Sequence, residues 1–304
     1  VLLDAIGARD GLKAHAPALR AAGAEVIALL PLQLFELDRL RPDLRNHRKI
    51  VVIDGCTAFF GSQNIVSSTA NKGLTNEEVV VRAEGAVVKQ LHAVLLGDRY
   101  LETADVPPEV DISGAVAPPP HRPAYAQVVP SGPGCRADTI ENVMVGLMYA
   151  ALSRVVLTTP YFVPSPQFIS AMRNAARRGV SVHLVVGKAS NKPFVQHAQE
   201  SYYDTLLDAG VHIHRYYGNF LHAKLMNVDE SVALIGSSNL DRRSFELNEE
   251  VTVLIYDPVV ATELWQIERG YLEKSDTVDP AAWSRRPAWR RLLQNVARLF
   301  DAVM

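Results

Sequence analysis

Two histidine–lysine pairs in this 304-residue chain are candidates for chemistry, because the residues around them recur at the same spacing. Each pair begins the pattern H-x-K-x4-D, and a G-S-x-N sequence follows, with its asparagine 17 residues after the histidine. A pattern fixed at so many positions would rarely recur by chance, so both copies are expected to form one active site. The copies comprise His47, Lys49, Asp54, Ser62 and Asn64 in the first half and His222, Lys224, Asp229, Ser237 and Asn239 in the second.

These residue types suit the binding of a phosphate. In a strand, residues i and i+2 project to the same side, so each histidine is expected beside its lysine. The two lysines would supply positive charge, and the asparagine and serine side chains of both G-S-x-N sequences would supply neutral donors to the phosphate oxygens. Neither motif has the carboxylate and imidazole cluster of a catalytic metal site, so neither a metal nor another cofactor is expected.

A pair of histidines suits a two-step displacement. One imidazole attacks phosphorus and forms a covalent phosphohistidine, while the other protonates the leaving oxygen and then deprotonates the acceptor. With a reference pKa near 6.5, imidazole serves in either form near neutrality. Glu78 and Glu250, which begin equivalent strands, are expected to accept from a histidine ring and fix its tautomer. Asp54 and Asp229 are further catalytic candidates, but both lie at turns, where a structural role is the alternative.

The elements that must position these residues alternate between strand and helix, which predicts an α/β fold. Two pseudo-symmetric domains are expected, each a mixed sheet flanked by helices, with the active site at their interface. Each H-x-K sequence is expected on a strand. The expected elements include strands at 49–53, 57–60, 78–83 and 251–256 and helices at 86–99, 195–209 and 259–272.

The domain boundaries follow from proline content and from the repeat. Residues 104–124 hold six prolines and are predicted to link a first domain, 1–103, to a second domain, 125–304. Residues 19–26 align with 206–213, but 140–181 have no counterpart before Val1. The first domain is therefore expected to be truncated at its amino terminus by roughly 40 residues.

The composition of the chain disfavours several classes of protein. A net charge of -2 and a pI near 6.5 differ from the basic composition of a general nucleic-acid binder. Two cysteines are too few for a disulfide framework, and neither a membrane-spanning run nor a signal peptide is predicted. The C-terminal segment interleaves tryptophan and leucine with five arginines between Arg285 and Arg298. It is predicted either to pack on the domain or to lie on an anionic membrane surface.

The duplicated motif resembles that of the phospholipase D superfamily, and within it the chain most resembles bacterial cardiolipin synthases. The resemblance implies a metal-independent transfer of a phosphatidyl group from one phosphatidylglycerol to another, with His47 as nucleophile and His222 as acid and base. It also implies phospholipid partners and a location at the bacterial cell membrane, on the cytoplasmic side. The similar segments are 45–55, 159–164, 220–224 and 236–248.

The chain departs from the family pattern at several places. The family usually has Gly-Gly where this chain has Gly61-Ser62, and aspartate where it has Glu78. Family members commonly begin with two membrane helices, which this sequence lacks. Three alternative functions stay open: phospholipid hydrolysis, cleavage of nucleic-acid phosphodiesters, and lipid binding without catalysis. The neutral charge disfavours the second, and the complete set of histidines and lysines disfavours the third.

Overall fold

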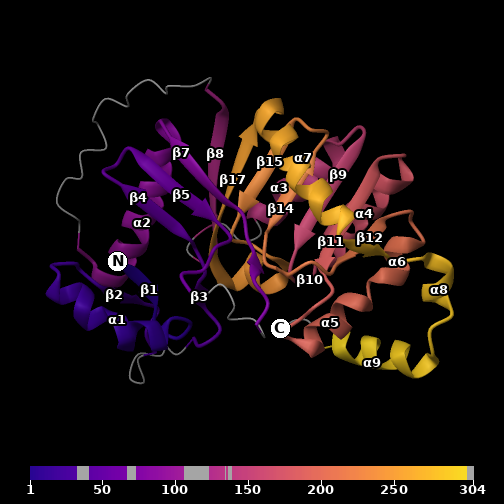
Figure 1. Ribbon diagram of the computed structural model, residues 1–304, viewed down its shortest axis with the longest axis horizontal. Helices are drawn as coiled ribbons and strands as arrows, with labels where there is room; N and C mark the ends of the chain where they lie inside the picture. The colour runs from indigo at the N-terminus through magenta and orange to yellow at the C-terminus, as the bar shows by residue number, and fades with distance from the viewer. Residues whose placement is uncertain (33–40, 67–72, 106–122, 134, 136–138, 300–304) are drawn as a thin grey trace.

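The computed structural model is an α/β molecule in which strands from the first and second halves of the chain meet near its centre (Figure 1). It describes residues 1–32, 41–66, 73–105, 123–133, 135 and 139–299. The predicted fold class is therefore confirmed as mixed sheets flanked by helices. Most of the predicted linker, residues 106–122, lies outside the described residues.

The largest sheet is built mainly from the second half of the chain. Its strands β9, β11 and β12 run parallel, the pairings of β18, β14, β15, β17 and β8 are antiparallel, and the short β3 (Arg45–Asn46) adds a parallel pairing at the start of β17. Runs of valine and leucine form these strands because the sheet is covered on both faces. In spatial order the strands are β18 (Ser275–Thr277), β12 (His212–Tyr216), β11 (Ser181–Gly187), β9 (Arg154–Thr159), β14 (Leu225–Val228), β15 (Val232–Gly236), β17 (Asn248–Tyr256) and β8 (Tyr125–Ser131).

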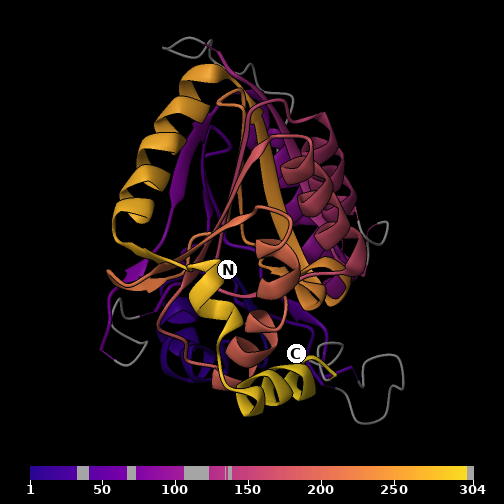
Figure 2. The ribbon, with the colours of Figure 1, turned by 90° about the vertical axis from the view of Figure 1, so that its right-hand side faces the viewer.

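Helices form a layer on each side of this sheet (Figure 2). Because strand side chains alternate, Val155 and Leu157 join one core cluster and Val156 joins the other. The first cluster lies under α3 (Thr139–Ala150), α4 (Pro166–Arg177), α5 (Pro193–Glu200) and α6 (Tyr203–Leu207). The second lies under α7 (Pro258–Glu273) and α2 (Ala86–Thr103).

The ends of these helices follow from local sequence. Ser165 accepts a hydrogen bond from the amide of Phe168, and Pro166 begins α4, as is typical of a capped amino terminus. The prediction of one helix over 195–209 is wrong, because two helices form there. The backbone N–H of Ser201 donates to the carbonyls of both residue i−4 and residue i−3, and the Ser201 hydroxyl donates to the Ala198 carbonyl. These bonds interrupt the regular α-helical hydrogen-bond pattern.

The first part of the chain forms two smaller sheets. The strands of its hairpin pair in the same register as those of the second half: Ile50 faces Phe60 as Leu225 faces Ile235. Phe60 lies in the same core cluster as Ile235, so the two parts share an apolar interior. The parallel pair is β1 (Leu2–Asp4) and β2 (Ile27–Leu29), joined by α1 (Arg9–Ala21), and the antiparallel sheet is β4 (Ile50–Ile53), β5 (Thr57–Gly61) and β7 (Val80–Glu84).

Two very short parallel pairings join the parts. β3 (Arg45–Asn46) pairs with the start of β17, and β6 (Asn76–Glu77) pairs with β13 (Phe220–Leu221). Each H-x-K sequence follows one of these short strands and precedes a longer one, so it lies between two strands, and the prediction that it lies on a strand is wrong. The remaining elements are β10 (Phe162–Val163), β16 (Leu240–Asp241), the π-helix η2 (Arg243–Leu247), α8 (Pro280–Ser284) and α9 (Ala288–Arg298).

Candidate active site

Each candidate histidine is held by a glutamate from the other part of the chain. The Nδ1 atom of His47 lies 2.9 and 3.0 Å from the two carboxylate oxygens of Glu250. The Nδ1 atom of His222 lies 2.8 Å from Oε1 of Glu78. The glutamates thus occupy the predicted orienting position, and the pairing is crossed between the two motif copies.

The short parallel pairings produce this crossing. β3 leads into His47 and lies beside the start of β17, where the backbone carbonyl of Glu249 accepts a hydrogen bond from the His47 amide at 2.8 Å. β13 leads into His222 and lies beside β6, where the backbone carbonyl of Glu77 accepts a hydrogen bond from the His222 amide, also at 2.8 Å. Each histidine is therefore fixed by its backbone as well as by its ring.

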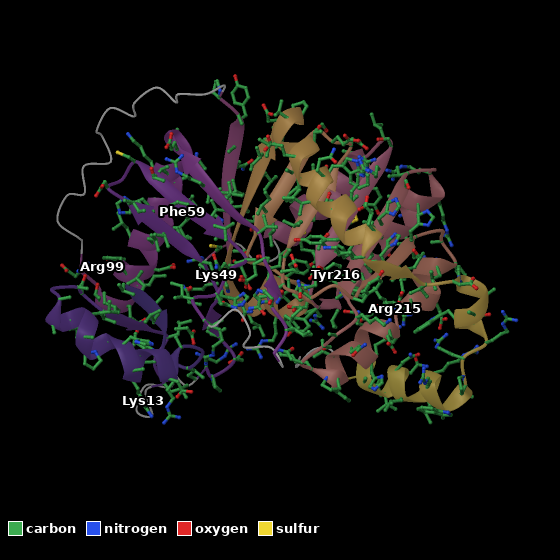
Figure 3. The ribbon with its side chains drawn as sticks, viewed as in Figure 1. Lys13, Lys49, Phe59, Arg99, Arg215 and Tyr216 are labelled. Atoms are coloured by element: carbon green, nitrogen blue, oxygen red, sulfur yellow. The ribbon has the colours of Figure 1, made fainter. Side chains whose placement is uncertain are left out.

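The two lysines take equivalent positions. Lys49 and Lys224 each donate from Nζ to the carbonyl of the histidine two residues earlier, at 2.6 Å in both cases. Burial lowers the pKa of Lys49 to about 8, against the charges of Glu250 and Glu78. Burial, followed by repulsion from Lys49, holds the pKa of Lys224 well below its usual value. Both lysines interact with the same two glutamates, and Lys224 also interacts with Lys49. They therefore lie close together near the centre of the molecule, where Figure 3 shows Lys49.

The histidine rings are neutral at pH 7. Burial, and then the charge of Lys224, lower the pKa of His222 to about 4. Burial also lowers the pKa of His47, although Glu250 opposes the shift. Burial disfavours ionisation of Glu250, but His47 and Lys49 together hold its pKa below the usual value. A neutral ring whose Nδ1–H donates to a carboxylate has a free lone pair on Nε2, which is the form a nucleophile or base needs.

The serines of the G-S-x-N sequences bind backbone rather than open space. The Ser62 hydroxyl accepts from the Val79 amide at 2.9 Å, and the Ser237 hydroxyl accepts from the Val251 amide at 3.0 Å. Both serines are buried, so their hydroxyls tie neighbouring strands together, contrary to the predicted phosphate contact. The preceding Gly236 permits this approach, since an added Cβ would lie 2.4 Å from the Val251 carbonyl oxygen.

The two asparagines differ in their surroundings. Asn64 is partly exposed, and its backbone N–H donates to Oε1 of Glu78 at 3.4 Å. The side-chain oxygen of Asn239 is buried and has no hydrogen-bond partner among the described residues. An amide oxygen can only accept a hydrogen bond, so this atom is open to a ligand hydroxyl, and donation from Asn239 to a phosphate stays a prediction.

The two aspartates of the motif lie elsewhere. Asp54 and Asp229 both have a φ of 52° and form the turns at the far ends of β4 and β14. The strand of four residues between each lysine and its aspartate spans about 13 Å. Asp229 accepts from the amides of 152, 153 and 154, each at 2.8 Å, so it holds the turn before β9. Asp54 is exposed. Neither is brought to the histidines, contrary to the catalytic prediction.

Sequence reasoning missed a buried network that supports His47. Asn46 donates to Asp98 at 2.9 Å and to Glu249 at 2.7 Å. Arg48 donates to the Glu250 carbonyl at 3.0 Å and forms an ion pair with Asp98. Burial raises the pKa of Asp98 to about 6, although Arg48 opposes the shift. Asp98 lies on α2, and nothing in its local spacing links it to a motif 50 residues earlier.

Within the described ranges there is no group of histidine, cysteine, aspartate or glutamate side chains arranged to hold a metal ion. The positive charge at the site comes from the lysines. What the arrangement offers a substrate is two neutral imidazoles oriented by carboxylates and two buried ammonium groups beside them, which is suited to displacement at an anionic phosphorus.

Comparisons with known proteins agree with this geometry. Residues 144–269 match the family described as "Cardiolipin synthase, PLD-like domain". Cardiolipin synthase A of Yersinia pseudotuberculosis (strain IP 31758) is 34% identical over 312 residues, and so is that of Yersinia pestis. The alignments take in 100% of this chain but 64% of each relative, so the chain spans less than two thirds of their length.

A solved structure shows the same fold. The phosphatidylserine synthase of Haemophilus influenzae superposes with a TM-score of 0.61 and 15% identity, over 85% of this chain and 69% of that protein. At this identity the likeness shows the fold alone. Residues 144–269 therefore carry a PLD-like domain of the cardiolipin synthase family, and the whole chain is similar to cardiolipin synthase A.

Proposed function

We propose that this chain is a phosphatidyltransferase that makes cardiolipin from two molecules of phosphatidylglycerol through a phosphohistidine. The crossed arrangement of His47 with Glu250 and His222 with Glu78 carries the proposal, because it provides two equivalent imidazoles beside two lysines, of which Lys224 is buried and Lys49 partly buried. Both halves of a double displacement then have a residue of the required type. The similarity to cardiolipin synthases supports the choice of substrate.

In the first step, Nε2 of one histidine attacks phosphorus, and the bond from phosphorus to the glycerol oxygen of the headgroup breaks. The other histidine gives a proton to that oxygen, and glycerol leaves. The family resemblance assigns the attack to His47 and the proton transfer to His222. The low pKa of His222 makes its protonated form a strong acid, and an incoming phosphate anion raises that pKa enough for the ring to carry the proton.

In the second step, His222 takes a proton from a headgroup hydroxyl of a second phosphatidylglycerol. The resulting oxygen attacks the phosphohistidine, the P–N bond breaks, and cardiolipin forms. Lys49 and Lys224 neutralise the non-bridging oxygens throughout, and Asn64 and Asn239 supply neutral contacts. The same route with water as acceptor would give phosphatidic acid and describe a hydrolase.

Product analysis separates these outcomes. Purified protein is mixed with phosphatidylglycerol in detergent micelles, and lipids and glycerol are measured over time. We expect cardiolipin and glycerol in equal amounts, and we expect His47→Ala and His222→Ala each to abolish both. Phosphatidic acid without cardiolipin would show a hydrolase instead, and cleavage of single-stranded DNA at a comparable rate would show a nuclease.

We further propose that the chain consists of two phospholipase D-like domains, 1–103 and 125–304, joined by 104–124. The matching hairpin registers in the two parts support this division. Phospholipid substrates place the enzyme at the bacterial cell membrane, and we propose its cytoplasmic side. None of the described helices is long and apolar enough to cross a bilayer.

A further inference from the structure

The helix α9 presents its apolar side chains away from the protein. Gln294 and Ala297 form its buried face against α5, and Ala297 belongs to the main core cluster. The opposite face carries an apolar stripe with spacings of three and four residues, which is one side of a helix. A helix that only packs on a domain would bury such a stripe. The stripe consists of Trp289, Leu292, Val296 and Leu299, which are 62%, 66%, 39% and 80% exposed.

Positive charge surrounds this stripe. From residue 280 to 300 the sequence has five arginines and no acidic residue, in a chain whose net charge is -2. Arg286 forms an ion pair with Asp204 and anchors the segment. In the described part of the chain no ion pair neutralises the other arginines, and Arg290 stacks on Trp289. The arginines in no ion pair there are Arg285, Arg290, Arg291 and Arg298, although the charge of Arg291 also acts on Asp204.

A small cavity extends the positive surface. It has a volume of about 290 Å³, lies where α9 ends, and includes Arg173, Arg242 and Arg298 in its lining. Arg298 stacks on Tyr202, and Arg242 is paired with Glu246. Three arginines from separate parts of the chain therefore line this cavity.

The helix is connected to the region of the candidate active site through packed elements. It packs on α5, α5 contacts β10, and β10 pairs with β16, which begins directly after Asn239. Figures 1 and 2 show α9 along the lower edge of the molecule, below the ends of β11 and β12.

We propose that α9 docks on the surface of an anionic phospholipid bilayer. The stripe enters the boundary between headgroups and acyl chains, and the unpaired arginines contact lipid phosphates. The uncompensated positive charge argues against a second copy of this chain, because two such helices would repel each other. The choice of a bilayer over an acidic protein rests on the proposed function, in which the substrate is itself an anionic lipid.

The test measures flotation of the 304-residue chain with vesicles of phosphatidylcholine alone or with added phosphatidylglycerol. We expect binding to the phosphatidylglycerol vesicles and a loss of at least tenfold in the Leu292→Glu/Val296→Glu variant. The control Leu101→Glu/Leu152→Glu adds the same charge at exposed leucines elsewhere and should bind as wild type does. The Arg290→Gln/Arg291→Gln variant should bind weakly, and its control Arg9→Gln/Arg177→Gln normally.

Several results would overturn the proposal. These are equal binding to neutral vesicles, binding that survives the Leu292 and Val296 substitutions, and a wild-type dimer that the same substitutions dissociate. Circular dichroism of each variant confirms that it is folded. Turnover of a water-soluble short-chain phosphatidylglycerol tests the proposed function separately, because it needs no docking. Its absence in wild type would sink the phosphatidyltransferase and leave the result on docking intact.

Discussion

At the scale of single residues, the glutamates determine what the histidines can do. A carboxylate at Nδ1 holds the proton on that nitrogen and turns the lone pair of Nε2 toward the substrate. The spacing of the motif was enough to identify both histidines and both lysines. It did not reveal which glutamate serves which histidine, because His47 and Glu250 are 203 residues apart and meet only through the pairing of β3 with β17.

The crossed pairing predicts the effect of removing one carboxylate. Glu78→Gln should lower the pKa of His222 further, since the Glu78 charge and hydrogen bond raise it, and should leave His47 nearly unchanged. Loss of the oriented tautomer should reduce kcat by about 10²- to 10⁴-fold. NMR titration of histidine-labelled protein measures the first effect and steady-state kinetics the second. Glu250→Gln is the matched control, in which His47 should respond instead.

The lysines and histidines predict a bell-shaped dependence of kcat/KM on pH. On the acid side, activity falls as the attacking His47 gains a proton, below the ordinary histidine value of about 6.5, because burial lowers its pKa. On the basic side, it falls as Lys49 loses its proton near pH 8. The measurement is kcat/KM for a soluble substrate between pH 4 and 10, at pH values where the protein is shown to stay folded. A rate that stays constant beyond pH 9.5 would contradict the role of Lys49.

At the scale of elements, the H-x-K-x4-D motif divides into an active end and a structural end. β14 carries His222 and Lys224 before its first residue and Asp229 after its last. The sequence predicted the strand and the turn, but alternation along a strand cannot tell which end faces the substrate. The sequence also predicted that both serines bind the phosphate. The close approach that Gly236 allows instead lets the Ser237 hydroxyl bind the backbone of the neighbouring strand.

Substitution of the motif aspartate should therefore affect stability and spare catalysis. Asp229→Ala removes the acceptor of three amides and the Ser153 hydroxyl, so the free energy of unfolding should fall by about 2 kcal/mol or more. Denaturant melts measure the loss, and kcat should change by less than about threefold. Asp229→Asn, which tolerates a positive φ, separates the lost contacts from backbone strain. A thousandfold loss of kcat in a stable protein would restore the catalytic assignment.

At the scale of the whole molecule, the lysines and glutamates of the two parts of the chain interact electrostatically at one site. Lys49 responds to Glu78 and Glu250, and Lys224 responds to the same two carboxylates. The fold class and the repeated motif were predictable because strand and helix patterns are local. The contact between the parts was not, since it depends on two pairings of two residues each.

Because the lysines supply the charge that a metal would otherwise provide, chelation should leave activity unchanged. We expect the rate of cardiolipin formation to stay within about 20% of control after dialysis against EDTA, as it does when no Lewis acid takes part. Added magnesium or zinc should likewise not increase it. A loss on chelation that a specific divalent ion reverses would require a metal in the site and would argue against the lysine-based mechanism.

The crossed glutamates also bear on how the protein is made. Translation proceeds from the amino terminus, so His47 leaves the ribosome long before Glu250, and His222 must find a partner synthesised 144 residues earlier. Early segments can fold during synthesis, but neither motif can be completed by its own neighbours. Under the proposed function, the site would therefore stay incomplete until the chain has been synthesised through Glu250. The exchange of carboxylates would then make turnover depend on the meeting of both parts.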